Sequence, residues 1–240
     1  MTKKIAVVTG ASGGIGRALV LELVRLGYGV HALALADQYL DELRSLEGVS
    51  CHPIDVCDTA AVAHIVQSLE VDVLINNAGI IGELQAAQRY SAPTADAIID
   101  INLRSAILTT LAVLPGMVAC NRGHIVFTGS IAGTRPTANT AVYSATKAGL
   151  SAFADGLRMD LFGTAIRVTL LAPGRVETRL YDQALGGPEQ AAARMYAGAA
   201  AIQPSEIAEL VGVVLSMPSH VDVTRLEVVP TAQVYGGSQI

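Results

Sequence analysis

The sequence has little that would suit a nucleic-acid-binding protein or a membrane protein. Its 240 residues include no tryptophan, only 15% charged residues and no run of basic side chains, and the formal net charge is −5. Proteins that bind nucleic acid usually present a basic patch or stripe, so we expect no nucleic-acid partner. No run of about 18 apolar residues occurs, and we therefore expect neither a membrane span nor a membrane partner.

Cysteine is also scarce. The three cysteines, Cys51, Cys57 and Cys120, form no C-x-x-C pair and no metal-ligand spacing. We expect reduced, structural thiols and no metal site. The first apolar run, residues 5–8, is too short for a signal peptide and is broken at once by Thr9 and Gly10. These features predict a cytoplasmic protein.

Apolar residues, by contrast, make up 51% of the chain and occur in short runs separated by helix-like segments. Strands are predicted at residues 5–9, 29–35, 51–54 and 71–76, and helices at residues 17–26 and 38–46. Strands and helices that alternate at this pace are typical of a parallel, doubly wound sheet with helices on both faces. We therefore predict a single α/β domain of the Rossmann type over residues 1–240.

A glycine-rich turn, Gly10-Ala-Ser-Gly-Gly-Ile-Gly16, follows the first predicted strand. Glycines let the backbone approach a diphosphate closely, and the start of the next helix presents free N–H groups to it. The spacing differs from the G-x-G-x-x-G of longer dinucleotide-binding dehydrogenases, and a tight connection without a ligand could use the same glycines. Its place between a strand and a helix favours nucleotide binding.

The end of the second predicted strand bears on the choice between NAD and NADP. In dinucleotide sites an acidic residue there binds the ribose hydroxyls, whereas an arginine accommodates the extra phosphate of NADP. Here Ala34, Leu35 and Ala36 precede Asp37, and no basic side chain follows at once. Asp37 comes late for the ribose contact and could instead cap the next helix. We predict a weak preference for NAD(H) over NADP(H).

Polar and small residues follow the third and fourth predicted strands. Asp55 comes after the third strand, and Asn76-Asn77-Ala78-Gly79 ends the fourth. The carboxyl ends of parallel strands share one edge of the sheet, and ligands bind there. We expect Asp55, Asn76 and Gly79 to lie at that edge, although each could equally serve a turn.

Tyr143 and Lys147 are four residues apart in the segment Thr140-Ala-Val-Tyr-Ser-Ala-Thr-Lys147. On a helix this spacing places both side chains on one face. An ammonium beside a phenol favours the phenolate, so we predict that Lys147 lowers the pKa of Tyr143. Tyr143 is then a candidate general acid and base. Taken alone, the pair could also be an ordinary solvated helix face.

Five motifs together resemble those of the short-chain dehydrogenase/reductase family, in its compact single-domain form. They are Thr9-Gly-x-x-x-Gly-x-Gly16, Asn76-Asn-Ala-Gly79, Asn102, Ser130 and Tyr143-x-x-x-Lys147. The resemblance extends from Lys4 past Pro204. It implies a seven-stranded parallel sheet and an oxidoreductase that uses NAD(P) to interconvert a small-molecule alcohol and its carbonyl. It also implies a homodimer or homotetramer.

The resemblance assigns a role to each matched residue. Ser130 would hydrogen-bond the substrate oxygen, Tyr143 would transfer the proton, and Lys147 would also hold the nicotinamide ribose. Asn102 would anchor a water on the proton path. The cofactor-binding positions that it implies, with Tyr143 and Lys147, are Gly10, Ser12, Gly13, Gly14, Ile15 and Gly16 at the diphosphate, Asp55 and Val56 at the adenine, Asn77, Ala78 and Gly79 on the adenosine side, and Pro173, Gly174, Val176 and Thr178 beside the carboxamide.

Three C-terminal stretches are similar to the branch of NADP-dependent 3-hydroxy acid dehydrogenases, which includes serine and allo-threonine dehydrogenases and sulfoacetaldehyde reductases. They are Gln203-Pro-Ser-Glu-Ile-Ala-Glu209, Pro218-Ser-His-Val-Asp-Val223 and Leu226-Glu-Val-Val-Pro230, together with Gln233. This implies a short 3-hydroxy acid, or a similar small acidic hydroxy compound, as substrate. Members of that branch usually carry two arginines where Leu35 and Ala36 stand. We expect a substrate lid at residues 177–201. Four arginines are candidates to pair with an acidic substrate, although each could instead be a surface or intersubunit residue: Arg135, Arg175, Arg179 and Arg194.

Other functions on a related fold remain as alternatives. A nucleotide-binding regulator would keep the glycine-rich turn but would have no reason to keep Ser130, Tyr143 and Lys147 together. A halohydrin-dehalogenase-like lyase would carry arginine in place of Lys147 and lack the dinucleotide turn. A sugar-nucleotide epimerase or dehydratase would normally be a longer chain. The residues present favour the oxidoreductase over all three.

Overall fold

The fold is built on one parallel sheet whose seven strands run in the order β3-β2-β1-β4-β5-β6-β7. The computed structural model describes residues 3–196 and 200–233. Its strands are β1 (Ile5–Thr9), β2 (Gly29–Ala34), β3 (Val49–Pro53), β4 (Val71–Asn76), β5 (Gly123–Thr128), β6 (Ile166–Pro173) and β7 (Arg225–Val228). The predicted Rossmann-type fold is confirmed. Of the four predicted strands, the third begins two residues earlier than expected, at Val49.

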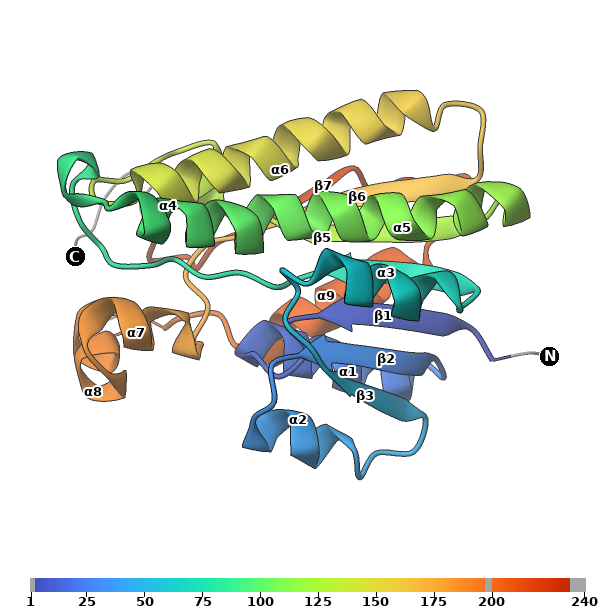
Figure 1. The fold of residues 1–240 in the computed structure, drawn as a ribbon, viewed down its shortest axis with the longest axis horizontal. Coiled ribbons are helices and arrows are strands. Elements are labelled where there is room, and N and C mark those ends of the chain that lie inside the picture. The colour runs from blue at the N-terminus through green and yellow to red at the C-terminus, as the bar shows by residue number, and fades with distance from the viewer. Residues whose placement is uncertain (1–2, 197–199, 234–240) are drawn as a thin grey trace.

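Helices cover both faces of the sheet (Figure 1). One layer holds α1 (Gly14–Arg25) and α9 (Pro204–Ser216), with α2 (Gln38–Leu43) beside β3. The other holds α3 (Thr59–Gln67), α4 (Ala92–Ile99), α5 (Ser105–Cys120) and α6 (Ala141–Asp160). Shorter helical turns are η1 (Ala87–Arg89), η2 (Asp100–Arg104), η3 (Ile131–Gly133), η4 (Arg179–Tyr181), α7 (Asp182–Leu185), α8 (Pro188–Ala191) and η5 (Ala192–Tyr196).

The strands are apolar throughout because both faces of the sheet are buried. In β1, Ala6 and Val8 pack toward α1 and α9, whereas Val7 packs into the opposite layer with Leu74 and Phe127. Successive side chains of a strand point to opposite faces, so one short run supplies both cores. This explains why continuous apolar runs, rather than alternating ones, predicted these strands.

One helical run, Ala92–Cys120, is long and apolar enough to cross a membrane by length and composition. It comprises α4, the π-helical turn η2 and α5, and it lies along the sheet in the layer with α3 and α6 (Figure 1). Its buried side includes polar groups that pair within the fold, such as Thr110 Oγ1, which accepts a hydrogen bond from Asn76 Nδ2 at 2.9 Å. The run thus has a place in the core of this fold.

The carboxyl ends of the strands meet at one edge of the sheet, and the segment after β6 lies beside that edge (Figure 1). This segment corresponds to the predicted lid and contains η4, α7, α8 and η5. A parallel bridge between Val176 and Ile202 ties its two ends together. Residues 197–199 of the predicted lid lie outside the described residues. The segment predicted to be a lid therefore lies beside the edge where ligands are expected, and its action as a lid stays a prediction.

Candidate active site

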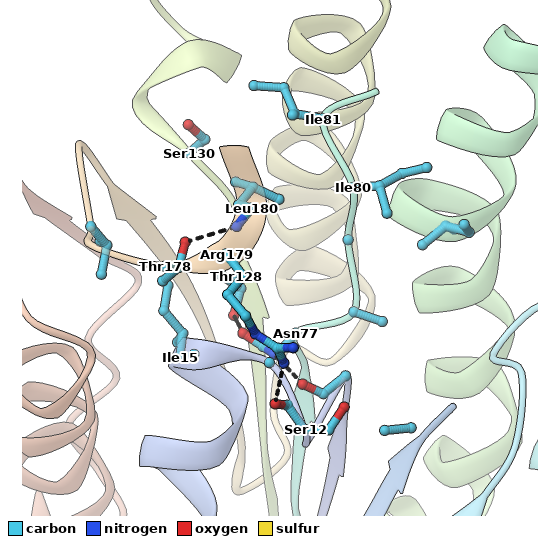
Figure 2. A pocket seen from close by; sticks show the side chains of 18 of the residues that line it. Ser12, Ile15, Asn77, Ile80, Ile81, Thr128, Ser130, Thr178, Arg179 and Leu180 are labelled. Atoms are coloured by element: carbon cyan, nitrogen blue, oxygen red, sulfur yellow. Dashed lines mark hydrogen bonds between the residues drawn. The ribbon is translucent and has the colours of Figure 1, made fainter. Parts of the chain in front are cut away.

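A cavity of about 530 Å³ lies at this edge, between the strand ends and the lid (Figure 2). That volume is within the range of sites that enclose small ligands and cofactors. Nearly all of the predicted site residues line it: Gly10, Ser12, Gly13, Gly14, Ile15, Asp55, Val56, Asn77, Ala78, Gly79, Ser130, Tyr143, Lys147, Pro173, Gly174, Val176 and Thr178. Gly16 and Asn102 are not among the lining residues.

The glycine-rich turn is packed too closely for side chains at its key positions. Gly10 has a φ of 62°, and a Cβ there would lie 2.8 Å from Ala78 Cα. A Cβ on Gly16 would overlap the carbonyl oxygen of Gly10. Gly16 is thus needed for the tight start of α1, behind the cavity wall. Such a cradle, with bare backbone and a helix N-terminus, fits the diphosphate of a dinucleotide.

Thr9 and Asn77 lock this turn to the end of β4. Thr9 Oγ1 accepts hydrogen bonds from the backbone N–H groups of Asn77 and Ala78, at 3.0 and 3.1 Å. Asn77 Nδ2 donates to the carbonyl oxygens of Thr9 and Gly10, both at 3.2 Å. The side chain of Asn77 therefore holds the turn in shape at the cavity wall.

Asn102 supports the site from behind. It is fully buried in η2, and its side chain exchanges two 2.8 Å hydrogen bonds with the backbone of Ile80 and donates to Thr146 Oγ1 at 3.1 Å. It links the loop after β4 to the helix that carries Tyr143. The structure therefore shows a positioning contact for Asn102, and its role in anchoring a water stays a prediction.

Ser130, Tyr143 and Lys147 converge at one end of the cavity. Ser130 follows β5 and caps η3, its Oγ accepting from Ala132 N at 3.1 Å. Tyr143 and Lys147 lie on one face of α6, as predicted, with Lys147 Nζ 5.7 Å from the centre of the Tyr143 ring. Both are buried, and Lys147 Nζ donates to the Thr128 carbonyl at 2.8 Å. The exposed-face alternative for this pair is therefore wrong.

The electrostatics of this pair differ from the expectation. Burial raises the pKa of Tyr143 above its ordinary value, and a hydrogen bond with Ser130 opposes that rise. Burial also lowers the pKa of Lys147 from 10.5 to about 8. Desolvation dominates because both groups lie away from water, and the ammonium lies over the Tyr143 ring at 5.7 Å from its centre. The predicted lowering of the Tyr143 pKa by Lys147 is not seen.

At the other end of the cavity an arginine approaches from the lid. Arg179 Nη2 donates to the carbonyl oxygen of Ser12 at 3.1 Å (Figure 2). Its guanidinium carbon lies 3.9 Å from the centre of the Tyr39 ring, and its Nη2 lies 4.0 Å from Asp37 Oδ2. Asp37 caps α2 by accepting from Leu40 N at 2.8 Å, which confirms the capping interpretation of that residue. The sequence prediction considered Arg179 as a substrate ligand or as a surface or intersubunit residue, and not as a cofactor ligand.

The other three candidate arginines have different surroundings. Arg135 pairs with Glu227 at 2.6 Å on the surface, and Arg194 is exposed on η5. Arg175 is half-buried, and its charge reaches Tyr181. Burial raises the pKa of Tyr181, the phenols of Tyr143 and Tyr196 raise it further, and the Arg175 guanidinium opposes them. Among these three arginines, Arg175 is the one whose charge acts on a lining residue, Tyr181, although Arg175 does not itself line the cavity.

Apolar residues that the sequence did not single out complete that end of the cavity. Ile80, Ile81 and Leu180 line it with Tyr181 (Figure 2). Tyr196, by contrast, braces the lid, since its hydroxyl lies within 3.2 Å of Val176 O and Thr178 O. Ile80 and Ile81 directly follow the Asn-Asn-Ala-Gly motif, which was a usable signal. Leu180 and Tyr181 had none beyond their place in the lid.

Comparison with known proteins supports the resemblance. Residues 4–186 match the family model described as short chain dehydrogenase. An uncharacterized short-chain type dehydrogenase/reductase of Sinorhizobium fredii is 47% identical over 237 residues, which cover 99% of this chain and 95% of the relative. The NADP-dependent 3-hydroxy acid dehydrogenase YdfG of Salmonella typhi is 37% identical over 244 residues, covering 98% of each chain.

Solved structures agree. The closed form of a serine dehydrogenase complexed with NADP+ superposes with a TM-score of 0.92 at 35% identity, covering 98% of both chains. Serine dehydrogenase from Escherichia coli gives a TM-score of 0.83 at 34% identity, covering 96% of this chain and all of that one.

These comparisons contradict the predicted preference for NAD(H), which is wrong, because the Salmonella relative is NADP-dependent and the serine dehydrogenase was solved with NADP+. The prediction relied on the residues that directly follow β2, Leu35 and Ala36, whereas the structure places the guanidinium of Arg179 at the same corner of the cavity. With a family model that matches most of the chain, and relatives aligned over nearly all of it, the chain belongs to the short-chain dehydrogenase/reductase family and acts on a CH–OH group.

Proposed function

We propose that this enzyme uses NADP(H) to interconvert a short 3-hydroxy acid, or a similar small acidic hydroxy compound, and its carbonyl. The observation that carries the proposal is the convergence of Ser130, Tyr143 and Lys147 at one end of a cavity whose middle is a diphosphate cradle. A regulator that only bound nucleotide would not need to bury a lysine beside a tyrosine, since burying both is costly.

Each of the three side chains has a part that its chemistry suits. Ser130 Oγ would polarise the substrate oxygen, and the Tyr143 hydroxyl would donate or accept the proton as that oxygen changes charge. Lys147, held by Thr128, would hydrogen-bond the nicotinamide ribose. The bound cofactor supplies the hydride acceptor or donor. The protein orients the partners and excludes water.

The remaining cavity residues would hold the dinucleotide. The glycine-rich turn would bind the diphosphate, and Asp55 and Val56 would border the adenine. The stretch from Pro173 to Thr178 would lie beside the carboxamide. Gly14 packs against Thr178, where a Cβ would come within 2.8 Å of Cγ2, so the cradle and this stretch already touch.

An acidic substrate is supported by the named activities of the relatives and by Arg175. The Salmonella relative acts on 3-hydroxy acids, and two of the matched structures are serine dehydrogenases. Arg175 is not itself among the residues that line the cavity, but it lies between Gly174 and Val176, which are, and its charge opposes the rise in the pKa of Tyr181, another lining residue. We propose that its guanidinium attracts the carboxylate of the substrate.

We also propose a cytoplasmic homo-oligomer without nucleic-acid or membrane partners. Large apolar side chains are exposed on one helical layer, with Leu111 50%, Met159 76% and Phe162 90% exposed. Burial of such side chains between identical subunits would remove them from water. Sedimentation velocity of the purified enzyme would test the assembly, and a monomer at micromolar concentration would contradict it.

The activity is tested by following NADPH absorbance with a panel of short carbonyl compounds. We expect turnover on members with a carboxylate near the carbonyl, and much weaker turnover on their methyl esters. Arg175→Gln should raise KM for the acids about tenfold and leave KM for the esters unchanged, since one charged hydrogen bond is lost. Equal rates on acids and esters would contradict the proposed substrate class.

A further inference from the structure

We propose that Arg179, a lid residue stacked on Tyr39, binds the adenosine 2′-phosphate of NADP in this enzyme. The proposal rests on the proposed use of NADP(H) and names the group that recognises it. In dinucleotide sites the arginine that accommodates this phosphate is usually supplied near the end of the second strand. Here that position offers Leu35, which is 64% exposed and has no polar side-chain atom.

The guanidinium of Arg179 lies at the corner of the cavity where β2 ends. Ser12, Leu35 and Asp37 form the corner of the cavity at the end of β2, and Arg179 lies in the same cavity wall. Figure 2 shows its side chain extending from the lid toward Ser12 in the glycine-rich turn. A group contributed by the lid thus occupies the region where strand-end arginines would otherwise act.

The guanidinium of Arg179 has N–H groups that can donate to a ligand at this corner of the cavity. Nη2 donates to Ser12 O, and its other N–H groups have no hydrogen-bond partner among the described residues. The side chain of Arg179 is 49% exposed. A guanidinium has five N–H donors in a planar fork that matches two phosphate oxygens. Arg179 can therefore keep its contact with Ser12 and still bind a phosphate.

Tyr39 fixes the orientation of that fork. The guanidinium carbon lies 3.9 Å from the centre of the ring, which is a close stacking distance. A stacked arginine has lost part of its rotamer freedom before a ligand arrives, so binding costs less entropy. Tyr39 therefore holds the guanidinium at this corner of the cavity.

No other described basic side chain is as well placed. Arg17, in the first turn of α1, is not among the residues that line the cavity, and its Nη2 pairs with Glu42 at 3.1 Å. Arg44, on α2, pairs with Asp41 at 3.0 Å and likewise does not line the cavity. The carboxylate of Asp37, 4.0 Å from Arg179, opposes an incoming phosphate and makes the site weaker than the guanidinium alone would give.

The lid position has a consequence that strand-end arginines would not have. Arg179 is flanked by Thr178 and Leu180, which line the cavity with it. A phosphate bound by Arg179 therefore bridges the lid to the glycine-rich turn. NADP should hold the lid over the cavity, whereas NAD, which lacks the 2′-phosphate, should not.

Equilibrium binding of four ligands, without turnover, tests the proposal. Dissociation constants of NADP+, NAD+, 2′,5′-ADP and 5′-AMP would be measured by calorimetry for the wild type, Arg179→Gln, Tyr39→Leu and the control Arg44→Gln. We expect Arg179→Gln to weaken NADP+ and 2′,5′-ADP about 10- to 100-fold, as for loss of charge-assisted hydrogen bonds to a phosphate. NAD+ and 5′-AMP should change less than about twofold. Arg44→Gln should leave all four unchanged.

The outcomes distinguish failure of the Arg179 assignment from failure of the proposed function. Equal weakening of NADP+ and NAD+ by Arg179→Gln would show a lid clasp without phosphate recognition and would overturn the assignment. Unchanged NADP+ binding would overturn it too. If wild-type protein bound neither dinucleotide, the proposed function itself would fail. Should Arg179→Gln not fold, Tyr39→Leu remains decisive, with an expected loss of about threefold for NADP+ alone.

A second readout follows the lid directly. Hydrogen exchange of the described lid residues 177–196 would be compared with NADP+ and with NAD+ at saturation. We expect NADP+ to slow exchange there by about tenfold more than NAD+ in the wild type, and the difference to vanish in Arg179→Gln. A difference that persists in the variant would contradict the role of Arg179.

Discussion

The two ends of the cavity are built in different ways. At the end with the proposed catalytic residues, here called the catalytic end, Ser130 lies between β5 and η3, and Tyr143 and Lys147 lie on α6, nearly out of contact with solvent. At the adenosine end, Arg179 and Tyr39 come from the lid and from α2, which lie far apart in the chain, and Arg179 remains half exposed. The proposed catalytic residues thus lie on the elements around the sheet, here called the frame, whereas the proposed cofactor recognition is shared with the predicted lid.

The largest effect that would test this contrast is at the catalytic end. Tyr143→Phe removes the hydroxyl that we expect to transfer the proton and leaves the ring that packs in α6. The turnover number should fall about 10²- to 10⁴-fold, the range for loss of a general acid or base. The dissociation constant of NADP+ should stay within about threefold. Steady-state kinetics and calorimetry on one preparation measure both, and normal turnover would remove Tyr143 from the mechanism.

Lys147→Met should separate catalysis from stability at the same end. We expect turnover to fall at least about 100-fold. Because the pKa of Lys147 is lowered from 10.5 to about 8, its buried ammonium costs the fold up to about 3 kcal/mol at pH 7. The unfolded chain binds the proton more tightly, so wild-type stability should rise between about pH 8 and 10.5.

Urea unfolding of wild type and variant across that pH range measures the effect. The variant should be more stable at pH 7, and the advantage should shrink as the pH rises and the wild-type lysine loses its proton. A variant less stable at pH 7 would show that the hydrogen bond from Lys147 to Thr128 outweighs the cost of burial.

The stability of the sheet beneath the catalytic end should fall in acid because of a buried histidine in β5. His124 lies at the opposite end of β5 from Ser130, and its Nε2 contacts Thr169 Oγ1 at 2.7 Å. Burial, and then the charge of Arg167, lowers the pKa of His124 to about 3. Its unfolded pKa is about 6.5, so the unfolded chain binds a proton first as the pH falls, and stability is lost below about pH 6.5.

We expect this histidine to remove about 2 kcal/mol of stability between pH 7.5 and pH 5. The double variant His124→Leu/Thr169→Val removes both partners of the hydrogen bond. Its free energy of unfolding should therefore fall by about 2 kcal/mol less than that of the wild type over the same pH interval. His31 and His52 titrate in both proteins and cancel in the difference. Equal losses in the two proteins would show that His124 does not stay neutral when buried.

The same contrast explains what the sequence could predict. The spacing of Tyr143 and Lys147 is a local property of a helix, and the glycine-rich turn is a contiguous motif, so both were placed correctly. The direction of the Tyr143 pKa shift was not, because it depends on the burial of the phenol and on its hydrogen bond with Ser130. Neither quantity is encoded in residue spacing.

Asn102 and Arg179 have positions that the sequence could not predict. The π-helical turn η2 that buries Asn102 leaves no pattern in the hydrophobic periodicity, so its distance from the cavity wall could not be foreseen. Arg179 meets Tyr39 and Ser12 only through the tertiary fold. The absence of arginine after β2 was read correctly, but the conclusion drawn from it about the cofactor was wrong.

A change at the end of β2 would test whether phosphate recognition can be moved from the lid to the strand end. Leu35→Arg places a guanidinium at the exposed strand end, and in the Arg179→Gln background it should restore NADP+ affinity about tenfold. The protection of the lid by NADP+ should not return, because the new arginine does not belong to the lid. Calorimetry and hydrogen exchange on the double variant measure the two effects separately. Recovery of both would mean that phosphate binding closes the lid without Arg179.

The smallest expected effect concerns the carboxylate that faces Arg179. Asp37→Asn keeps an oxygen that can accept from Leu40 N and so preserves the cap of α2. It removes the negative charge 4.0 Å from the guanidinium. NADP+ affinity should rise about two- to fivefold, because the partly screened repulsion between the Asp37 carboxylate and the 2′-phosphate is removed. NAD+ should be unaffected, and the gain should shrink in 0.5 M salt, where screening is stronger. A gain for both cofactors would place Asp37 near a part of the dinucleotide that they share, so that its charge would act at the ribose or diphosphate rather than at the 2′-phosphate.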